Sequence, residues 1–98
     1  MKFVIKLGGT TLENPATLQG STRAIVELVR DGHQVAVVHG GGAALTRTLT
    51  QLGKRSEFVA GLRITDAETR DAALMVLGGR VNKQLVAAIG KHGQAAGG

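Results

Sequence analysis

Residue types that often organise a small protein are missing from this chain. Its 98 residues include no cysteine, tryptophan or tyrosine, and only one proline. Without cysteine, the chain can form neither a disulfide nor a thiolate metal site. Phe3 and Phe58 are the only aromatic residues, so the core has to be built from Val, Ile, Leu and Ala. Few rings are left on which nucleic-acid bases could stack.

The chain also lacks any apolar run near the roughly 20 residues that span a bilayer. Its N-terminus does not combine a basic stretch, a long apolar stretch and a small-residue cleavage site. We therefore expect no membrane partner and a cytoplasmic location. The formal net charge is +5, but no basic run is longer than Lys54-Arg55. This scatter argues against a nucleic-acid partner and is compatible with acidic, phosphorylated ligands.

Two strand-like runs end abruptly in glycines. Residues 35–38 are followed by His39 and then Gly40-Gly41-Gly42, and residues 3–7 are followed by Gly8-Gly9. Glycine lets backbone N–H groups approach an anion closely, and a helix N-terminus behind it adds unpaired donors. One glycine would suffice for a tight turn, so three in a row favour a cradle for an oxyanion or a carboxylate.

Hydrophobic periodicity in the first half of the chain predicts an α/β unit. We expect strands at 2–7 and 35–38, joined by a helix that begins at Asn14-Pro15 and ends at Gly32. The right-handed crossover rule makes two strands connected in this way parallel.

The second half predicts a helix over 44–52, a hairpin that turns at Ala60-Gly61, and a last long helix. Thr65 and Glu68 have the spacing of a capping box, with Thr65 as the N-cap of that helix. Gly78-Gly79 should interrupt or kink it. The order of elements is typical of helices packed on a mostly parallel sheet.

Two cations are candidates for a binding site. Lys6 lies at the C-terminal end of the first strand, where open α/β sheets bind ligands and an ammonium can meet a phosphoryl group. The alternative is a solvated edge lysine, but its apolar neighbours and the following glycines favour function. Arg63 could grip a carboxylate with both arms of its guanidinium or form a surface ion pair. His39 should bond to the backbone, and Asn82-Lys83 should be polar surface residues.

Several known site patterns are absent. No G-x-G-x-x-G opens a helix after a strand, and no G-x-x-x-x-G-K-[ST] occurs. His-Gly-Gly-Gly also forms the oxyanion hole of some esterases, but no G-x-S-x-G nucleophile turn accompanies it here. The histidines at 33, 39 and 92 lack metal-ligand spacing, so these residues predict no metal site.

Three motifs together resemble those of the amino acid kinase family: Lys6-Leu7-Gly8-Gly9, Val38-His39-Gly40-Gly41-Gly42 and Gly61-Leu62-Arg63-Ile64-Thr65. Each motif is weak alone, but their order and spacing are specific. The resemblance covers essentially the whole chain. Within the family it points to members that phosphorylate N-acetyl-L-glutamate in arginine biosynthesis. Relatives that act on carrier-protein-bound aminoadipate or glutamate in lysine biosynthesis keep similar motifs and are the alternative.

The resemblance implies a partial three-layer αβα sandwich and a homo-oligomer. It also implies transfer of the γ-phosphoryl group of ATP, with Mg, to the γ-carboxylate of N-acetyl-L-glutamate. Such a transfer needs mainly positioning and electrostatic stabilisation. The implied site residues are Lys6 for charge on the phosphoryl group, Gly8 and Gly9 for phosphate oxygens, Gly41 and Gly42 for the substrate, and Arg63 for the substrate α-carboxylate.

Members of this family are much longer than this chain, and their C-terminal half binds ATP. The resemblance therefore implies that residues 1–98 are the N-terminal, amino-acid-substrate-binding portion of such a kinase, inactive without the nucleotide-binding half. A non-catalytic, self-associating binding module, which would cover exposed sheet edges and apolar helix faces, is the hypothesis of a different class.

Overall fold

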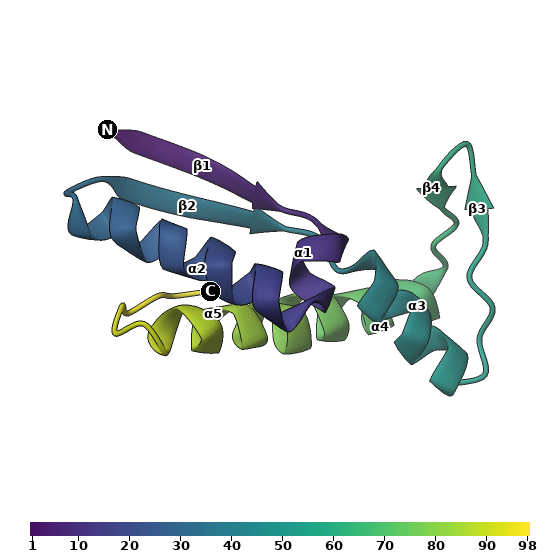
Figure 1. The fold of residues 1–98 in the computed structure, drawn as a ribbon. Helices are drawn as coiled ribbons and strands as arrows, with labels where there is room; N and C mark the ends of the chain where they lie inside the picture. The colour runs from purple at the N-terminus through teal and green to yellow at the C-terminus, as the bar shows by residue number, and fades with distance from the viewer.

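The computed structural model describes residues 1–98 and contains two small sheets and a set of helices (Figure 1). In chain order the elements are β1 (Lys2–Leu7), α1 (Gly9–Glu13), α2 (Pro15–Arg30), β2 (Gln34–His39), α3 (Gly42–Gln51), β3 (Phe58–Val59), β4 (Leu62–Arg63), α4 (Ala67–Ala73), the π-helix η1 (Leu74–Val81) and α5 (Asn82–Gly90). Only the short helix α1 has no counterpart among the elements predicted from the sequence.

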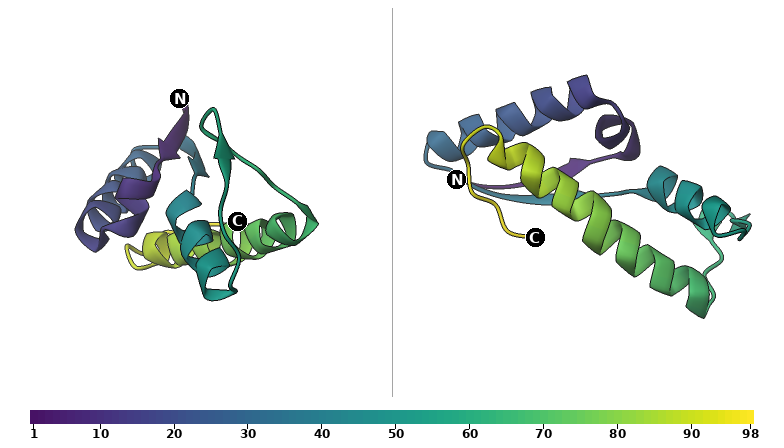
Figure 2. Two further views of the ribbon diagram at one scale, coloured as in Figure 1. Left: turned by 90° about the vertical axis from the view of Figure 1, so that its right-hand side faces the viewer. Right: turned by 90° about the horizontal axis from the view of Figure 1, so that it is seen from below.

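β1 and β2 form the predicted parallel pair. Lys2 lies opposite Gln34 at one end and Leu7 opposite His39 at the other. Helices α2 and α5 both lie along one face of this sheet (Figures 1 and 2). The residues buried between the sheet and these helices are Leu7, Ile25, Val26, Leu85 and Ile89. Alternate strand residues therefore face a helical layer, as the period of two along a strand requires.

The other face of the same sheet has no helical layer. Val4 and Val38, which point to it, are 76% and 54% exposed. The structure thus confirms the α/β class and the parallel sheet, and it shows the sheet and one helical layer of the expected sandwich. Lys6 is on this open face and is exposed.

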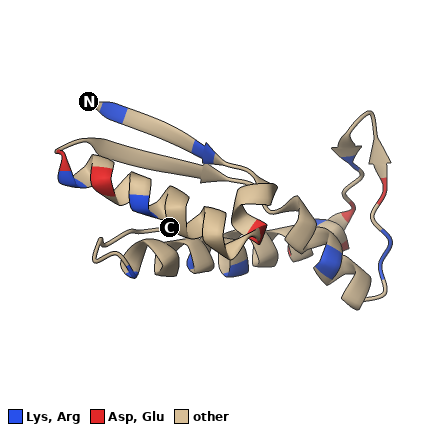
Figure 3. Ribbon diagram, in the orientation of Figure 1, with Lys and Arg blue, Asp and Glu red and all other residues tan.

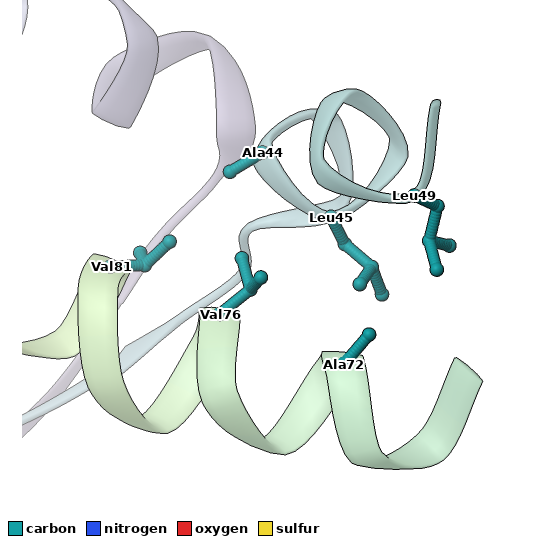
Figure 4. Packing of buried hydrophobic residues seen from close by; sticks show 6 residues of the cluster. All are labelled: Ala44, Leu45, Leu49, Ala72, Val76 and Val81. Carbon is teal, nitrogen blue, oxygen red and sulfur yellow. The ribbon is translucent and has the colours of Figure 1, made fainter. Parts of the chain in front are cut away.

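A second core joins α3 to the long C-terminal helix (Figure 4). Its buried residues are Ala44, Leu45, Leu49, Ala72, Val76 and Val81, from α3, α4 and η1. In α3 the apolar residues recur at helical spacing, so one face of the helix is buried and the other is solvated. This core attaches α3, and the turn that precedes it, to α4 and η1.

The interruption predicted at Gly78-Gly79 takes the form of a π-helix between α4 and α5 and not of a break. The backbone stays helical from Ala67 to Gly90, and the glycines lie inside η1, whose wider turns replace a break. Such π-helical segments are uncommon and often lie near functional sites. Here Val76 and Val81, which flank the glycines, are buried against α3, so the packing of this face holds the segment helical.

The helix ends follow the sequence closely, with one exception. Asn14 caps α2 by accepting hydrogen bonds from the N–H groups of Ala16 (2.9 Å) and Thr17 (3.4 Å), as predicted. Gly32 follows its C-cap with φ of 93°, also as predicted.

The capping box assigned to Thr65 is wrong by one residue. Asp66 is the N-cap of α4, and its carboxylate accepts the N–H of Thr69 at 2.8 Å. Glu68 lies 3.6 Å from the ammonium of Lys54 instead of reaching back to the cap. Lys54 also donates to Asp66 at 2.6 Å, so an ion pair favours aspartate over threonine at this position.

β3 and β4 form the predicted antiparallel hairpin, with Phe58 opposite Arg63 and Val59 opposite Leu62. Ala60 and Gly61 have φ of 51° and 79°, the left-handed pair of a tight hairpin turn. The hairpin stands apart from the β1–β2 sheet, beyond α3 (Figure 1).

Lys and Arg are distributed over the helices, β1 and the hairpin region, interspersed with acidic residues (Figure 3). None of the helices has the length and apolarity needed to cross a membrane. Residues 94–98 have no regular secondary structure.

The Lys54–Asp66 pair predicts a dependence of stability on pH. The hydrogen bond from Lys54, followed by that from the Thr69 N–H, holds the pKa of the Asp66 carboxyl far below its usual range. A carboxyl whose pKa is lowered in the folded state contributes stability above its unfolded pKa, about 3.9, and loses it as the pH falls further. Asp66→Asn keeps a cap but removes the charge, so we expect it to be less stable than the parent protein at pH 7.

In urea unfolding followed by circular dichroism, this difference should stay constant between pH 7 and 5 and shrink as the pH falls below about 4. Asp71→Asn is the matched control, since Asp71 is 69% exposed and its nearest cation, Arg70, is 3.7 Å away. A stability difference for Asp66→Asn that does not depend on pH would contradict the assignment to the ion pair.

Candidate functional site

The parallel pairing of β1 and β2 brings the two glycine turns to one edge of the sheet. Gly8 precedes α1 and Gly41 precedes α3, and both helices start just after the carboxyl end of a strand. The N–H of Gly40 donates to the carbonyl of Leu7 at 3.1 Å, which joins the two turns directly. The predicted phosphate-binding and substrate-binding glycines are therefore neighbours in space.

The three consecutive glycines have different surroundings. Gly41 is buried, has φ of 153°, and a Cβ there would overlap Leu77 and come within 3.2 Å of Val81. The packing of the turn against η1 thus explains one glycine without any ligand. A Cβ on Gly40 or Gly42 would meet no atom within 4 Å. The same is true of Gly8 and Gly9, so at these positions the backbone borders open space.

The two helices that start at this edge have no side chain to cap their first N–H groups. Neither α1 nor α3 has a capping hydrogen bond from its N-cap residue, because both N-caps are glycine. The first N–H groups of a helix have no acceptor within it. The N–H of Gly41 has no protein acceptor either. In α3, a helix of ten residues, these donors coincide with the positive end of the helix dipole, an arrangement that favours an anion.

Lys6 stands at the same edge. It is the penultimate residue of β1, lies opposite Val38 and belongs to the open face of the sheet. Its ammonium makes no hydrogen bond or ion pair within residues 1–98. The stem can lie along the exposed apolar surface around Val38 while the charge reaches past the end of the strand.

Arg63 connects the hairpin to the glycine turn. Its Nη2 donates to the carbonyl of Gly42 at 3.3 Å and to the hydroxyl of Thr46 at 3.0 Å, and its Nη1 donates to Ser56 at 2.8 Å. The guanidinium also lies 4.7 Å from the ring centroid of Phe58. A guanidinium has five N–H donors, so these three bonds leave at least two for a ligand.

The sequence did not mark Thr46 and Ser56 as candidate site residues. Thr46 lies on α3 and Ser56 in the loop before the hairpin. Their hydroxyls bind the guanidinium of Arg63 and hold it against the first turn of α3. No local pattern marks them, because a hydroxyl on a helix face or in a loop is common. Only their hydrogen bonds to Arg63 in the folded chain give them a role.

His39 behaves as predicted in one respect and differs in another. Its Nδ1 lies 2.8 Å from the carbonyl oxygen of Gly40, the expected bond to the backbone. Its Nε2 lies 3.1 Å from the amide nitrogen of Asn82, and Lys83 donates to Asn82 at 2.8 Å. Asn82, expected to be a surface residue without further contacts, therefore reaches the histidine that precedes the glycine turn, whereas Lys83 bonds to Asn82 and to the carbonyl of Gly98 at 2.7 Å.

The acidic and imidazole groups of this chain do not assemble into a metal centre. No three of the His, Asp and Glu side chains lie together. His33 is 3.2 Å from the N-terminal amine, and His92 is 3.0 Å from Thr22, so each of these histidines has its own partner. The edge of the sheet offers donors for anions rather than ligands for a cation.

Parallel strands that end in glycine turns, with a lysine and an arginine beside them, define an α/β protein of the class that holds its ligand at the carboxyl edge of the sheet. The sequence model of the Amino acid kinase family matches residues 1–98. The chain belongs to the amino acid kinase family.

Several relatives are named acetylglutamate kinase. An acetylglutamate kinase from Acidobacterium capsulatum is 72% identical over 96 residues, which are 98% of this chain and 37% of that protein. An acetylglutamate kinase from Koribacter versatilis is 58% identical, with the same two shares. One from Methanothrix thermoacetophila is 49% identical over 91 residues, 93% of this chain and 32% of that protein. This chain thus spans 37% or less of the length of these relatives.

Solved structures with the same arrangement include N-acetylglutamate synthase from Neisseria gonorrhoeae. Its complex with coenzyme A and L-arginine has a TM-score of 0.72 and 25% identity, over 99% of this chain and 22% of that one. Its complex with coenzyme A and N-acetyl-glutamate has a TM-score of 0.71 and 26% identity, over 90% and 20%. These matches support the fold described above.

The surroundings of the triplet predict opposite outcomes for two neighbouring glycines. Gly41→Ala should cost about 2–4 kcal/mol of unfolding free energy, because it combines a strained φ with overlap against Leu77. Gly42→Ala, the matched control, should change stability by about 0.5 kcal/mol or less. Urea denaturation of the purified variants checks both values. Equal stability of the two variants would mean that η1 does not pack on Gly41 as described.

Proposed function

We propose that residues 1–98 form the amino-acid-substrate side of an acetylglutamate kinase and act within a protein of the length of its relatives. The reaction is phosphorylation of the γ-carboxylate of N-acetyl-L-glutamate by ATP. The proposal rests on one observation: the relative from Acidobacterium capsulatum, 72% identical over nearly the whole chain, is named acetylglutamate kinase. The position of the cations and glycine turns at one edge supports it independently.

In the proposed reaction a γ-carboxylate oxygen attacks the γ-phosphorus of ATP, a P–O bond forms, and the bond to the leaving ADP breaks. Charge on the phosphoryl oxygens has to be stabilised during this transfer. Lys6 supplies a positive charge from the end of β1, and the N–H groups of Gly8 and Gly9 donate hydrogen bonds to phosphate oxygens. No covalent protein nucleophile is needed, so positioning and electrostatics carry the reaction.

The amino-acid substrate is held on the α3 side of the edge. The N–H groups of Gly41 and Gly42 donate hydrogen bonds to carboxylate oxygens, and Arg63 binds the α-carboxylate through its remaining donors. Arg63 is suited to this because three hydrogen bonds already fix its guanidinium before substrate arrives. A side chain that is ordered in advance loses less entropy on binding.

Mg²⁺ bound to ATP would neutralise phosphate charge during the transfer. Residues 1–98 fit the phosphate oxygens, through the uncapped N–H groups, but they supply no cluster of metal ligands. We propose that the nucleotide and its metal are held mainly by the part of the protein that corresponds to the remaining length of the relatives, and that the kinase is a homo-oligomer.

A coupled assay of ATP consumption tests the proposal. The full-length kinase that contains residues 1–98 should turn over N-acetyl-L-glutamate, and residues 1–98 alone should not. Turnover by residues 1–98 alone would overturn the placement of the nucleotide site. Turnover only with an aminoadipate or glutamate bound to a carrier protein would show that the carrier-bound amino acid, and not N-acetyl-L-glutamate, is the substrate.

Replacing Lys6 tests its role at the phosphoryl group. Lys6→Met should lower kcat at least about 100-fold, as does loss of a group that stabilises transition-state charge in other enzymes. Lys2→Met is the matched control, because Lys2 lies on the same face of β1 at the far end of the strand. Steady-state kinetics of both variants give the comparison. Equal kcat values would remove Lys6 from the mechanism.

Replacing Arg63 tests the carboxylate contact. Arg63→Ala should weaken binding of N-acetyl-L-glutamate about 10- to 100-fold, the range for a charged hydrogen-bonded pair. Arg47→Ala is the control, since Arg47 lies on α3 as a 57% exposed ion pair with Glu13. Calorimetric titration measures both affinities. Unchanged affinity in Arg63→Ala would show that another group holds the α-carboxylate.

A further inference from the structure

A row of hydrogen bonds runs from α5 to the glycine turn. Lys83 donates to Oδ1 of Asn82 at 2.8 Å, Nδ2 of Asn82 lies 3.1 Å from Nε2 of His39, and Nδ1 of His39 lies 2.8 Å from the carbonyl oxygen of Gly40. His39 and Asn82 are half-buried between β2 and α5. None of these side chains has the role of a substrate contact in the proposed reaction.

The chemistry of the two ends decides the direction of every bond in this row. An ammonium only donates, so Oδ1 of Asn82 faces Lys83 and the NH₂ group faces His39. A carbonyl only accepts, so Nδ1 of His39 carries the proton that bonds to Gly40. In the neutral ring Nε2 is then the acceptor that Asn82 needs. Each member has one consistent role, and His39 has a defined tautomer.

The last bond of the row orients the peptide between Gly40 and Gly41. This peptide is trans, as are all others in the chain. In a trans peptide the carbonyl and the N–H point in opposite directions. Because the Gly40 carbonyl is held toward the His39 ring, the Gly41 N–H points away from it. That N–H has no protein acceptor, although Gly41 is buried.

A peptide between two glycines needs such a constraint. Without Cβ atoms, both residues reach conformations that would turn this peptide over at little steric cost. Packing of Gly41 against Leu77 and Val81 restricts the Cα position, but it places no polar group on the peptide. The hydrogen bond from His39 is the contact that distinguishes one peptide orientation from the other.

We propose that His39 and Asn82 are positioning residues that hold the Gly41 N–H toward the carboxylate of the amino-acid substrate; this rests on the function proposed above. His39 acts by donating to Gly40, and Asn82 acts by keeping the ring in the tautomer that can donate. Lys83 orients Asn82. The three side chains hold the binding site from the face of the sheet opposite to Lys6.

Two substitutions of His39 separate this role from simple packing. His39→Asn keeps a donor near the position of Nδ1 but has less volume, and His39→Leu keeps volume but has no donor. We expect His39→Leu to raise the KM for N-acetyl-L-glutamate about tenfold, the effect of one misplaced donor, and to leave the KM for ATP unchanged. His39→Asn should stay near the parent value. A packing role predicts the reverse order and would overturn the proposal.

His33→Leu is the matched control. His33 lies at the opposite end of β2, where its ring packs on Phe3 and bonds to the N-terminal amine. Its substitution should leave both KM values unchanged. Thermal unfolding of the full-length variants identifies any that fail to fold, and in that case the measurement on the parent protein below decides.

Nitrogen-15 NMR of the His39 ring tests the row of bonds without substrate. In the full-length kinase, Nδ1 should be protonated and Nε2 should carry the lone pair. A protonated Nε2 at neutral pH would overturn the inference, whatever the substrate. If the predicted tautomer is found but the parent enzyme does not turn over N-acetyl-L-glutamate, the proposed function fails and the hydrogen-bonded row is supported.

Discussion

The parallel pairing of β1 with β2 is the interaction on which the rest of this structure depends. It sets Leu7 opposite His39, and the hydrogen bond from Gly40 to Leu7 extends the pairing one residue past the strands. Both glycine turns are thereby placed at one edge, with Lys6 beside them. The starts of α1 at Gly9 and α3 at Gly42 then share one small region with Lys6, although 33 positions separate the two helix starts along the chain. Any shift in the register of the strands would separate these groups or turn Lys6 into the helical layer.

The glycine turn at β2 is held from three sides. η1 packs directly on Gly41, Arg63 bonds to the carbonyl of Gly42, and His39 bonds to that of Gly40. None of these contacts occupies the N–H of Gly41, which has no protein acceptor. The helical segment 67–90 therefore acts on the turn in two ways: Leu77 and Val81 pack against Gly41, and Asn82 orients the ring of His39. Because these contacts come from three other parts of the chain, they can keep the glycine-rich turn in one backbone conformation.

Most of the elements, and the edge that carries the site, could be predicted from the sequence, because their signals are local. Asn14 and Gly32 bound α2 through rules that involve only nearby residues. The errors arose where local signals were ambiguous. Thr65 and Asp66 can both cap a helix, and the choice of Asp66 follows from Lys54, twelve residues earlier. Gly78-Gly79 does interrupt the α-helical pattern, but with Val76 and Val81 buried the segment stays helical as the π-helix η1. The roles predicted for Lys6, Gly8, Gly9, Gly41, Gly42 and Arg63 stay predictions.

The sequence alone determined the strands, the capped helices and the two glycine turns, since backbone preference and hydrophobic period act over a few residues. It also determined that a lysine would lie near the C-terminal end of the first strand. Only the tertiary structure decided what surrounds these groups. The anchoring of Arg63 by Thr46 and Ser56, and the link from Asn82 through His39 to Gly40, join residues up to 43 positions apart. Such contacts depend on how helices pack on the sheet and on each other, and no local propensity encodes that packing.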